Sequence, residues 1–535
     1  REPGKLVYHQ KCFGTFAYDI AVNWEKEGRT LTGAWSITST HGLSGTYAPF
    51  ESLGALNRGF DIALRNHLIT WSQFWSRSSI SVPDSLIQRQ YERDIYKLGC
   101  AAAADARPIS LQSVWTYDTL RLPAWKGDYH YSLRVPMCYL PVWASNHSEL
   151  GEGLLNTLWE QREKYREYTR TFFGKPGINI PGSAALDGEQ MGGWAQYAMS
   201  QTVGAQMARF FWLHWKYTGD SAFLAQRAYP FTLEVARFLE AQTEVGKDCK
   251  RRLEYSSSPE LFDNSPMAWF REQSNFDLAL IKTAFANAAE MADSLERPIE
   301  SDHWRSLLEQ LPDFSIRRQF GDLTYAGKIA YDTSHRTLSQ AWAIYPLGLV
   351  DPSQGPEASD LIDKTLWSID SHGYKWWAGY SFGLYAGLLA RAGRGDRAAE
   401  NLHMFIEHFT FPNTLHVNGD RLRTGTSRMI YTPYSIDGNF VSAAATQELL
   451  LQSVGNTIRV FPAIPLDWRD VSFTNLRAMG GVLVSARLEK GRLAHLELEM
   501  DPGARASSFI VEYPGGRQML NLSPGKSVVI RTNDK

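Results

Sequence analysis

Large hydrophobic residues alternate with smaller or polar ones near the start of the chain. Phe16, Tyr18, Ile20 and Val22 fall on one face, which is the period of a half-buried β-strand. A turn at Glu27-Gly28 then leads into a second predicted strand over residues 31–38. Because one hairpin is only marginally stable by itself, we interpret residues 1–75 as the tail of an N-terminal β region, whose start lies outside this chain, followed by a linker.

Over residues 84–453 the hydrophobic pattern changes to the period of a helix. Met207, Phe210, Phe211, His214 and Trp215 fall at i, i+3, i+4, i+7 and i+8 and form one apolar helix face. Comparable patterns predict helices near residues 84–104, 150–170, 192–217, 221–243, 276–295, 335–349, 377–392, 396–409 and 441–451. Long loops rich in Trp, Gly, Pro and Asp connect these segments, which fits a closed ring of helix pairs with a cleft formed by the loops.

After residue 453 the period returns to two. Leu496, Leu498 and Met500 alternate with Glu497 and Glu499, and Pro-Gly and Gly-Gly pairs separate the strands. The predicted fold is therefore mainly α. A helical domain at 76–455 is flanked by the N-terminal β segment and by a C-terminal antiparallel β domain at 456–535.

Composition excludes several classes of function. The 55 basic and 57 acidic residues give a formal net charge of -2, which excludes the broad basic surface of a nucleic-acid-binding protein. No run of about 18 apolar residues occurs, so we expect no transmembrane helix. The four cysteines form no Cys-x-x-Cys pair and indicate neither a disulfide framework nor a zinc site. The residues that follow Arg1 do not resemble a signal peptide, so we expect a processed or truncated start.

Aromatic residues make up 13% of the chain, with 18 Trp, 24 Tyr and 26 Phe. Two interpretations remain open. The rings fill a large, well-packed core, or they line a binding cleft against which pyranose rings stack.

Several short motifs lack the context that their chemistry requires. Gly379-Tyr380-Ser381-Phe382-Gly383 matches the nucleophile elbow G-x-S-x-G, but the residues before it are too few for the buried strand that this motif needs. The segment 523–527 resembles the end of a phosphate-binding loop, but Leu520 stands where its first glycine belongs. His403 and His408 are poorly spaced for two ligands on one helix face, and no H-E-x-x-H occurs. We therefore expect no catalytic metal and no cofactor.

Two carboxylates stand in positions that suit catalysis. Glu260 follows Ser258-Pro259 in a polar loop, and Asp437 precedes Gly438 just before a predicted helix. A glycosidase needs two such groups, one proton donor and one base or nucleophile. The same positions also suit an exposed loop acid and a helix cap, respectively, so the residues alone leave both alternatives open.

Nine short motifs occur in order along residues 110–488. They lie in Leu111-Gln112-Ser113-Val114-Trp115, Pro123-Ala124-Trp125, Val203-Gly204-Ala205, Tyr217-Thr218-Gly219-Asp220, Ser258-Pro259-Glu260, Ser334-His335-Arg336-Thr337-Leu338-Ser339, Ile436-Asp437-Gly438-Asn439-Phe440, Glu448-Leu449-Leu450-Leu451-Gln452-Ser453, and Phe461-Pro462-Ala463-Ile464-Pro465 with Leu476-Arg477-Ala478-Met479-Gly480-Gly481. Together they resemble glycoside hydrolase family 95, the inverting α-L-fucosidase and α-L-galactosidase family. This resemblance implies an (α/α)6 barrel, Glu260 as general acid, Asp437 as the base that activates water, and His335 as a sugar contact. It also implies a periplasmic or secreted bacterial protein.

One stretch departs from the family pattern. The family's NxNxxMNYW motif carries two asparagines that help hold the attacking water, and those positions are Ser132 and Arg134 in this chain. Arg134 accepts no hydrogen bond and adds a fixed positive charge. We therefore expect a changed sugar specificity, and since a guanidinium binds a carboxylate in bidentate fashion, a uronic acid is a candidate ligand.

The leading hypothesis is an inverting exo-glycosidase that removes a terminal sugar from an oligosaccharide or polysaccharide. Burial among aromatic rings is expected to raise the pKa of Glu260 and keep it protonated. The predicted substrate-binding residues are Trp125, Asp128, His130, Ser132, Arg134, His335, Trp377 and Asn439. Two alternatives remain, a non-catalytic carbohydrate-binding relative and a polysaccharide lyase that acts on a uronate, with Tyr131 as the candidate base and Arg134 neutralising the uronate.

Overall fold

The structure is a computed structural model that describes residues 4–12, 14–40, 47–115 and 124–530. Pro123, in one of the family-like motifs, lies outside the described residues. Contacts divide the chain into two compact units, Arg1–Arg77 and Ser78–Lys535. No helix in the described ranges is long and apolar enough to cross a membrane.

The first unit contains a three-stranded antiparallel sheet in the order β1-β2-β3 and two helices. Its elements are β1 (Lys5–Lys11), β2 (Ala17–Glu27), β3 (Thr30–Ser39), α1 (Ala48–Arg58) and α2 (Phe60–Ser76). The predicted hairpin is confirmed, because β2 pairs with β3 along its length. The buried residues of β2 are Ala21 and Asn23, on the face opposite to Tyr18, Ile20 and Val22, so the alternation predicted the strand but not its more buried face. The Asn23 amide donates a hydrogen bond to Ser52 Oγ on α1 at 2.6 Å. Helices α1 and α2 occupy residues that the sequence interpretation left as a linker.

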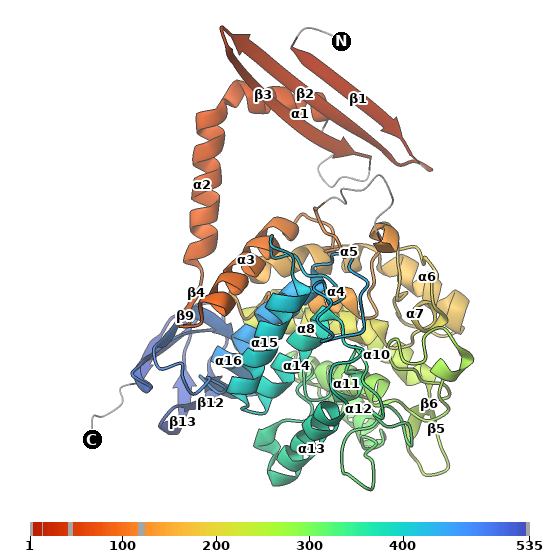
Figure 1. Cartoon of the computed structure of the whole chain (residues 1–535). Coiled ribbons are helices and arrows are strands. Elements are labelled where there is room, and N and C mark those ends of the chain that lie inside the picture. The colour runs from red at the N-terminus through yellow and green to blue at the C-terminus, as the bar shows by residue number, and fades with distance from the viewer. Residues whose placement is uncertain (1–3, 13, 41–46, 116–123, 531–535) are drawn as a thin grey trace. The chain divides into compact units, whose positions relative to one another are not determined.

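The second unit is mainly helical and contains the (α/α)6 barrel (Figure 1). Its α-helices are α3 (Ser85–Ala101), α4 (Arg134–Cys138), α5 (Glu152–Glu160), α6 (Arg162–Phe173), α7 (Ala195–Ala198), α8 (Val203–Thr218), α9 (Ser221–Phe223), α10 (Tyr229–Gln242), α11 (Asn275–Ser294), α12 (Pro298–Glu309), α13 (Pro356–His372), α14 (Gly379–Arg391), α15 (Gly395–Phe409) and α16 (Asp437–Leu450). Helix α8 follows the predicted pattern, since Met207, Phe210 and Phe211 are buried and Gly219 ends the helix in the left-handed conformation that suits glycine.

The helix predicted over residues 335–349 is wrong. This segment has a single short 3-10 turn, Ser339–Ala341, followed by further turns in the loop. Its apolar residues Trp342, Ile344 and Tyr345 are buried, so the segment contributes to the core without a helical period. Pro346 lacks the amide hydrogen that a helix interior needs, which explains why the apolar run does not continue as a helix.

The C-terminal part of this unit consists of two sheets. One has the strand order β14-β11-β10-β9-β4, and the other has the order β13-β12-β8-β7. The strands are β4 (Ser79–Ser81), β7 (Leu451–Val454), β8 (Thr457–Val460), β9 (Val471–Ala478), β10 (Val482–Glu489), β11 (Arg492–Met500), β12 (Ser507–Tyr513), β13 (Gly516–Leu522) and β14 (Ser527–Ile530). Leu496, Leu498 and Met500 on β11 are fully buried, as their alternation predicts. The pairing is antiparallel except between β12 and β8, which run parallel.

No parallel strand precedes the G-x-S-x-G segment in the described part of the chain. The sheet between α10 and α11 is a two-stranded antiparallel pair, β5 (Thr243–Val245) and β6 (Arg251–Leu253). Gly379 to Gly383 form the start of α14, and the buried Ser381 hydroxyl donates to the carbonyl of Arg336 at 2.6 Å. Ser381 therefore has a structural role, and the nucleophile-elbow interpretation fails.

Candidate active site

A cavity of about 1230 Å³ opens among the loops of the second unit. Its lining residues are far apart in the sequence and lie within residues 125–134, 183–197, 260–263, 333–336 and 418–431, together with Trp376. The cavity is larger than the pockets of about 300–1,000 Å³ that hold small ligands, so it has room for more than one sugar ring. Six of the predicted site residues line it, namely Trp125, Asp128, His130, Arg134, Glu260 and His335.

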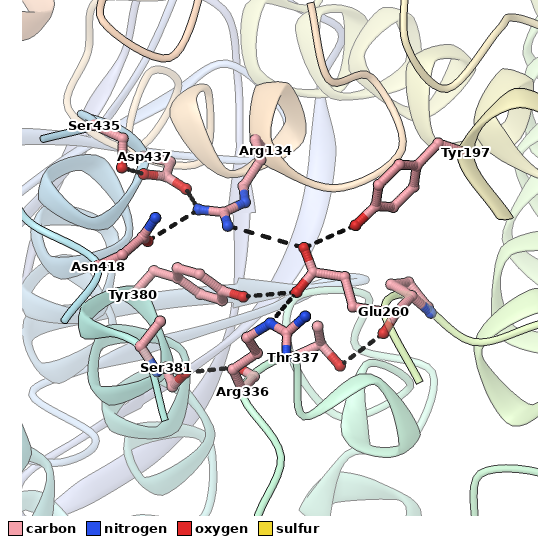
Figure 2. Close-up of polar contacts among 12 residues, drawn as sticks. Arg134, Tyr197, Glu260, Arg336, Thr337, Tyr380, Ser381, Asn418, Ser435 and Asp437 are labelled. Atoms are coloured by element: carbon pink, nitrogen blue, oxygen red, sulfur yellow. Dashed lines mark hydrogen bonds and ion pairs between the residues drawn. The ribbon is translucent and has the colours of Figure 1, made fainter. Parts of the chain in front are cut away.

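Glu260 is held in the cavity wall by its backbone and by four side chains. The residue adopts the left-handed conformation at φ 61°, which is uncommon outside glycine and restricts where its carboxylate points. Its amide donates to Gln196 Oε1 at 3.0 Å. The hydroxyl of Tyr197 donates to Oε1 at 3.0 Å, Tyr380 approaches Oε2 at 3.5 Å, and Arg336 forms a close ion pair with Oε2 (Figure 2).

The protonation state of Glu260 differs from the sequence-based expectation. Burial acts to raise the pKa of this carboxyl, but Arg336 and then Arg134 outweigh burial and lower the pKa to about 2. Glu260 is therefore ionised in the free protein at neutral pH. The expected raised pKa is wrong, because that expectation considered burial alone, whereas two guanidinium groups, those of Arg336 and Arg134, lie beside the carboxylate.

Asp437, the predicted base, is fully buried at the first turn of α16 and does not itself line the cavity; it lies behind Arg134, which does. Its Oδ1 accepts a hydrogen bond from the Ser435 hydroxyl at 2.7 Å, and its Oδ2 lies 2.7 Å from Arg134 Nη1. His416 Nδ1 lies 2.9 Å from the carbonyl of Ser435 and 3.3 Å from Asp437 Oδ1. Burial acts to raise the pKa of Asp437, but Arg134 and His416 hold it well below its usual range, so the carboxylate is ionised.

Arg134 lies between the two carboxylates, as Figure 2 shows. From the start of α4 its Nη1 contacts Asp437 and donates a hydrogen bond to Asn418 Oδ1 at 3.2 Å, while its Nη2 lies 3.8 Å from Glu260. Its guanidinium stacks over the Tyr380 ring at 4.5 Å and lies 5.7 Å from the Trp125 ring. The sequence interpretation proposed that the Arg134 guanidinium binds the carboxylate of a uronic acid. In the structure this guanidinium is already paired with carboxylates of the chain itself.

The other predicted residues that line the cavity, His335, Asp128 and His130, form two smaller groups. His335 places Nε2 3.2 Å from the backbone carbonyl of Glu260 and Nδ1 3.1 Å from Thr337 Oγ1. Burial and the charge of Arg336 lower the pKa of His335 to about 4, so its ring is neutral at pH 7. Asp128 lies 3.4 Å from His130 and accepts a hydrogen bond from Ser183 at 3.2 Å.

Three predicted substrate-binding residues do not line the cavity. Trp377 is fully buried against Tyr374 and Phe382, and its neighbour Trp376 lines the cavity instead. Asn439 is fully buried, donates to Asp94 and Thr414, and accepts from the His416 amide, so its role is to hold the start of α16. Ser132 is buried away from the lining.

Sequence reasoning missed several polar residues of this site. Arg336, Tyr197, Tyr380 and Asn418 all contact Glu260 or Arg134, yet none was singled out. Arg336 stands directly beside His335 in a family-like motif, so its position was the one available signal. In the described part of the chain no group of three or more His, Cys, Asp or Glu side chains is arranged to hold a metal ion.

Comparisons with known proteins agree on a family. The model of the glycosyl hydrolase family 95 catalytic domain matches residues 76–450. Alpha-L-fucosidase 2 of Arabidopsis thaliana is 26% identical over 459 residues, which cover 83% of this chain and 52% of that protein. Probable alpha-fucosidase A of Aspergillus niger is 24% identical over 432 residues, which cover 71% of this chain and 49% of that protein. The chain therefore spans about half the length of the curated relatives it matches.

The fold also resembles solved structures of low sequence identity. A putative kojibiose phosphorylase from human microbiome aligns with a TM-score of 0.65 at 10% identity, covering 99% of this chain and 76% of that chain. At this identity the likeness concerns the fold alone.

Proposed function

The chain belongs to glycosyl hydrolase family 95, and from this premise we propose that it is an inverting, α-L-fucosidase-like exo-glycosidase. Glu260 acts as the general acid, Asp437 as the general base, and Arg134 changes the specificity of the sugar-binding floor. The observation that carries this proposal is the convergence of both carboxylates on one guanidinium, that of the cavity-lining Arg134. The names of the two relatives make an α-L-fucosyl glycan the first substrate to test.

The proposed inversion requires a gap between the two acids that is wide enough for water. An inverting pair is separated by about 6.5–9.5 Å to leave room for water, whereas a retaining pair is only about 5–5.5 Å apart. Two carboxylates that contact different nitrogens of one guanidinium are held apart by that group. In this proposal water replaces the guanidinium when substrate binds, and Asp437 takes a proton from that water.

The walls of the cavity suit a substrate with several rings. Trp376 and Tyr431 line it with exposed fractions of 43% and 57%, and Trp194 stacks on Tyr197 nearby. Flat aromatic faces pack against the apolar faces of pyranose rings. We therefore propose an oligosaccharide or polysaccharide substrate, and a periplasmic or secreted location remains a prediction from the family resemblance.

A second candidate is a carbohydrate-binding relative without turnover, and the observation that favours it is the Arg134–Asp437 ion pair at 2.7 Å. A base neutralised by a guanidinium does not accept a proton from water until that pair opens. Product analysis with an α-L-fucosyl oligosaccharide separates the two candidates. Free fucose supports the hydrolase, while saturable binding without any product supports the second candidate.

Removing the Arg134 charge should raise activity. If the ion pair opens in each turnover, Arg134→Asn avoids the cost of breaking a buried pair, which is about 3 kcal/mol and corresponds to roughly a 100-fold gain in kcat/KM. The same substitution leaves Asp437 buried without its cation, so the melting temperature should fall. Arg134→Lys is the matched control, since it keeps the positive charge and should stay slow. A loss of activity in Arg134→Asn as severe as in Asp437→Asn would contradict this role.

The pH dependence of kcat/KM should reflect the lowered pKa of Glu260. A general acid must be protonated in the free enzyme, and with a pKa of about 2 its protonated fraction falls about tenfold for each pH unit above that value. We therefore expect kcat/KM to fall steadily between about pH 4 and pH 7. Arg336→Gln removes one cation beside Glu260, raises the pKa, and should shift this fall to higher pH, whereas Arg305→Gln on the surface should not. Identical profiles for Arg336→Gln and the unsubstituted protein would show that Glu260 is not the titrating acid.

A further inference from the structure

A second cavity, of about 60 Å³, lies at the junction between the barrel and the C-terminal strands. Its lining includes Arg209 and Tyr217 from α8, Arg391 from α14, Glu448 from α16 and Arg477 from β9. This junction cavity exceeds the roughly 10–15 Å³ of such space that one water molecule needs, so it has room for a small ion. None of these residues takes part in the proposed hydrolysis.

The junction cavity carries an excess of positive charge. Three guanidinium groups face one carboxylate, Glu448, which is bound by Arg391 Nε and Nη2 at 2.5 and 2.8 Å. Arg477 forms a close ion pair with Asp501 and donates to Asn146 Oδ1 at 2.8 Å. In the described part of the chain Arg209 has no carboxylate within ion-pair distance, and its one hydrogen bond is to the carbonyl of Pro346 at 2.8 Å.

Further hydrogen-bond donors line the junction cavity together with Arg209. The indole Nε1 of Trp143 is buried and has no hydrogen-bond partner among the described residues, although Trp143 lines the junction cavity. Tyr217 and Tyr345 also line it, and the charges of Glu448, Arg391 and Arg209 act on both phenols. Burial, together with the charge of Arg391, lowers the pKa of Arg209 to about 10, so the guanidinium remains charged at neutral pH. Burying this charge costs free energy of folding, which a bound anion would offset.

We propose that the junction cavity binds one small monovalent anion, chloride under ordinary salt conditions, through Arg209 with Trp143 Nε1 and the tyrosine hydroxyls as further donors. The anion supplies the counter-charge that Arg209 lacks and joins barrel helices α8, α14 and α16 to strands β7 and β9. A ligand that binds the folded state and not the unfolded state stabilises the fold in proportion to the logarithm of its concentration above its Kd. Chloride should therefore stabilise this protein independently of its activity.

Thermal unfolding in sodium chloride and in sodium gluconate at equal ionic strength tests the proposal, because equal ionic strength screens surface charges equally. The midpoint should rise with chloride and not with gluconate in the unsubstituted protein. Arg209→Gln should lose this difference, while Arg305→Gln, at an exposed position paired with Asp293, should keep it. An undiminished chloride response in Arg209→Gln, or the absence of any chloride response in the unsubstituted protein, would overturn the proposal.

A second measurement does not depend on the variant being folded. Crystals of the unsubstituted protein soaked in bromide should give an anomalous peak in the junction cavity, within hydrogen-bond distance of Arg209. Ordered water without an anomalous peak would mean that the cavity is hydrated and holds no anion, and would overturn the proposal.

Discussion

Asp437→Asn should abolish hydrolysis of every glycoside tested, including aryl glycosides whose leaving groups need no protonation. The substitution removes the base that takes a proton from water, and no leaving group compensates for that loss. General-base catalysis contributes about 10²–10⁴-fold to rate, so we expect a fall in kcat of at least that size. Initial rates with aryl and natural α-L-fucosides measure the effect.

A buried aspartate elsewhere provides the matched control. Asp322 is also fully buried and bound by an arginine, but that arginine, Arg317, does not line the large cavity, whereas Arg134, the partner of Asp437, does. Asp322→Asn should lower the melting temperature and leave kcat near its original value. If Asp437→Asn keeps substantial activity on activated substrates, Asp437 is not the base.

Glu260→Gln should reduce activity in a way that depends on the leaving group. The amide keeps the size of the side chain and accepts a hydrogen bond from Tyr197, but it supplies no proton to the glycosidic oxygen. Turnover of natural glycans should fall about 10²–10⁴-fold, while aryl glycosides with acidic phenols should fall far less. Rates plotted against the pKa of the leaving phenol test this expectation.

The slope of that plot identifies the acid. A steep dependence on the phenol pKa in Glu260→Gln and a shallow one in the unsubstituted protein would support Glu260 as proton donor. An equal loss for all leaving groups would instead indicate that Glu260 positions the substrate or another side chain.

Local periodicity was enough to predict much of the fold. The β2–β3 hairpin, helices α8 and α14, and strand β11 all follow from hydrophobic spacing within a single segment. The wrong prediction over residues 335–349 has the same origin, because its apolar residues are buried through loop turns that have no regular period. Similarly, the prediction chose Trp377, which is buried, although its neighbour Trp376 lines the cavity. The sequence shows two adjacent tryptophans but does not show which of the two side chains points toward the cavity.

The electrostatics of the site could not be predicted from local patterns. Arg134 and Asp437 are 303 residues apart, and their ion pair exists because α4 and α16 meet beside the same cavity. The alignment of Arg134 with a water-holding position indicated where the chain departs from its family, but it did not indicate that the guanidinium would bind the base. For the same reason the pKa of Glu260 was expected to rise with burial, whereas the neighbouring arginines lower it.

The stereochemistry of hydrolysis tests the central claim most directly, because it depends on the placement of Glu260 and Asp437 on opposite sides of the scissile bond. Proton NMR of an α-L-fucosyl oligosaccharide during the first minutes of reaction identifies which anomer of the released sugar forms first. A single-displacement reaction with Asp437 as base predicts β-L-fucose as the first-formed anomer. If α-L-fucose forms first, the reaction proceeds with retention and the assignment of Asp437 as base is contradicted.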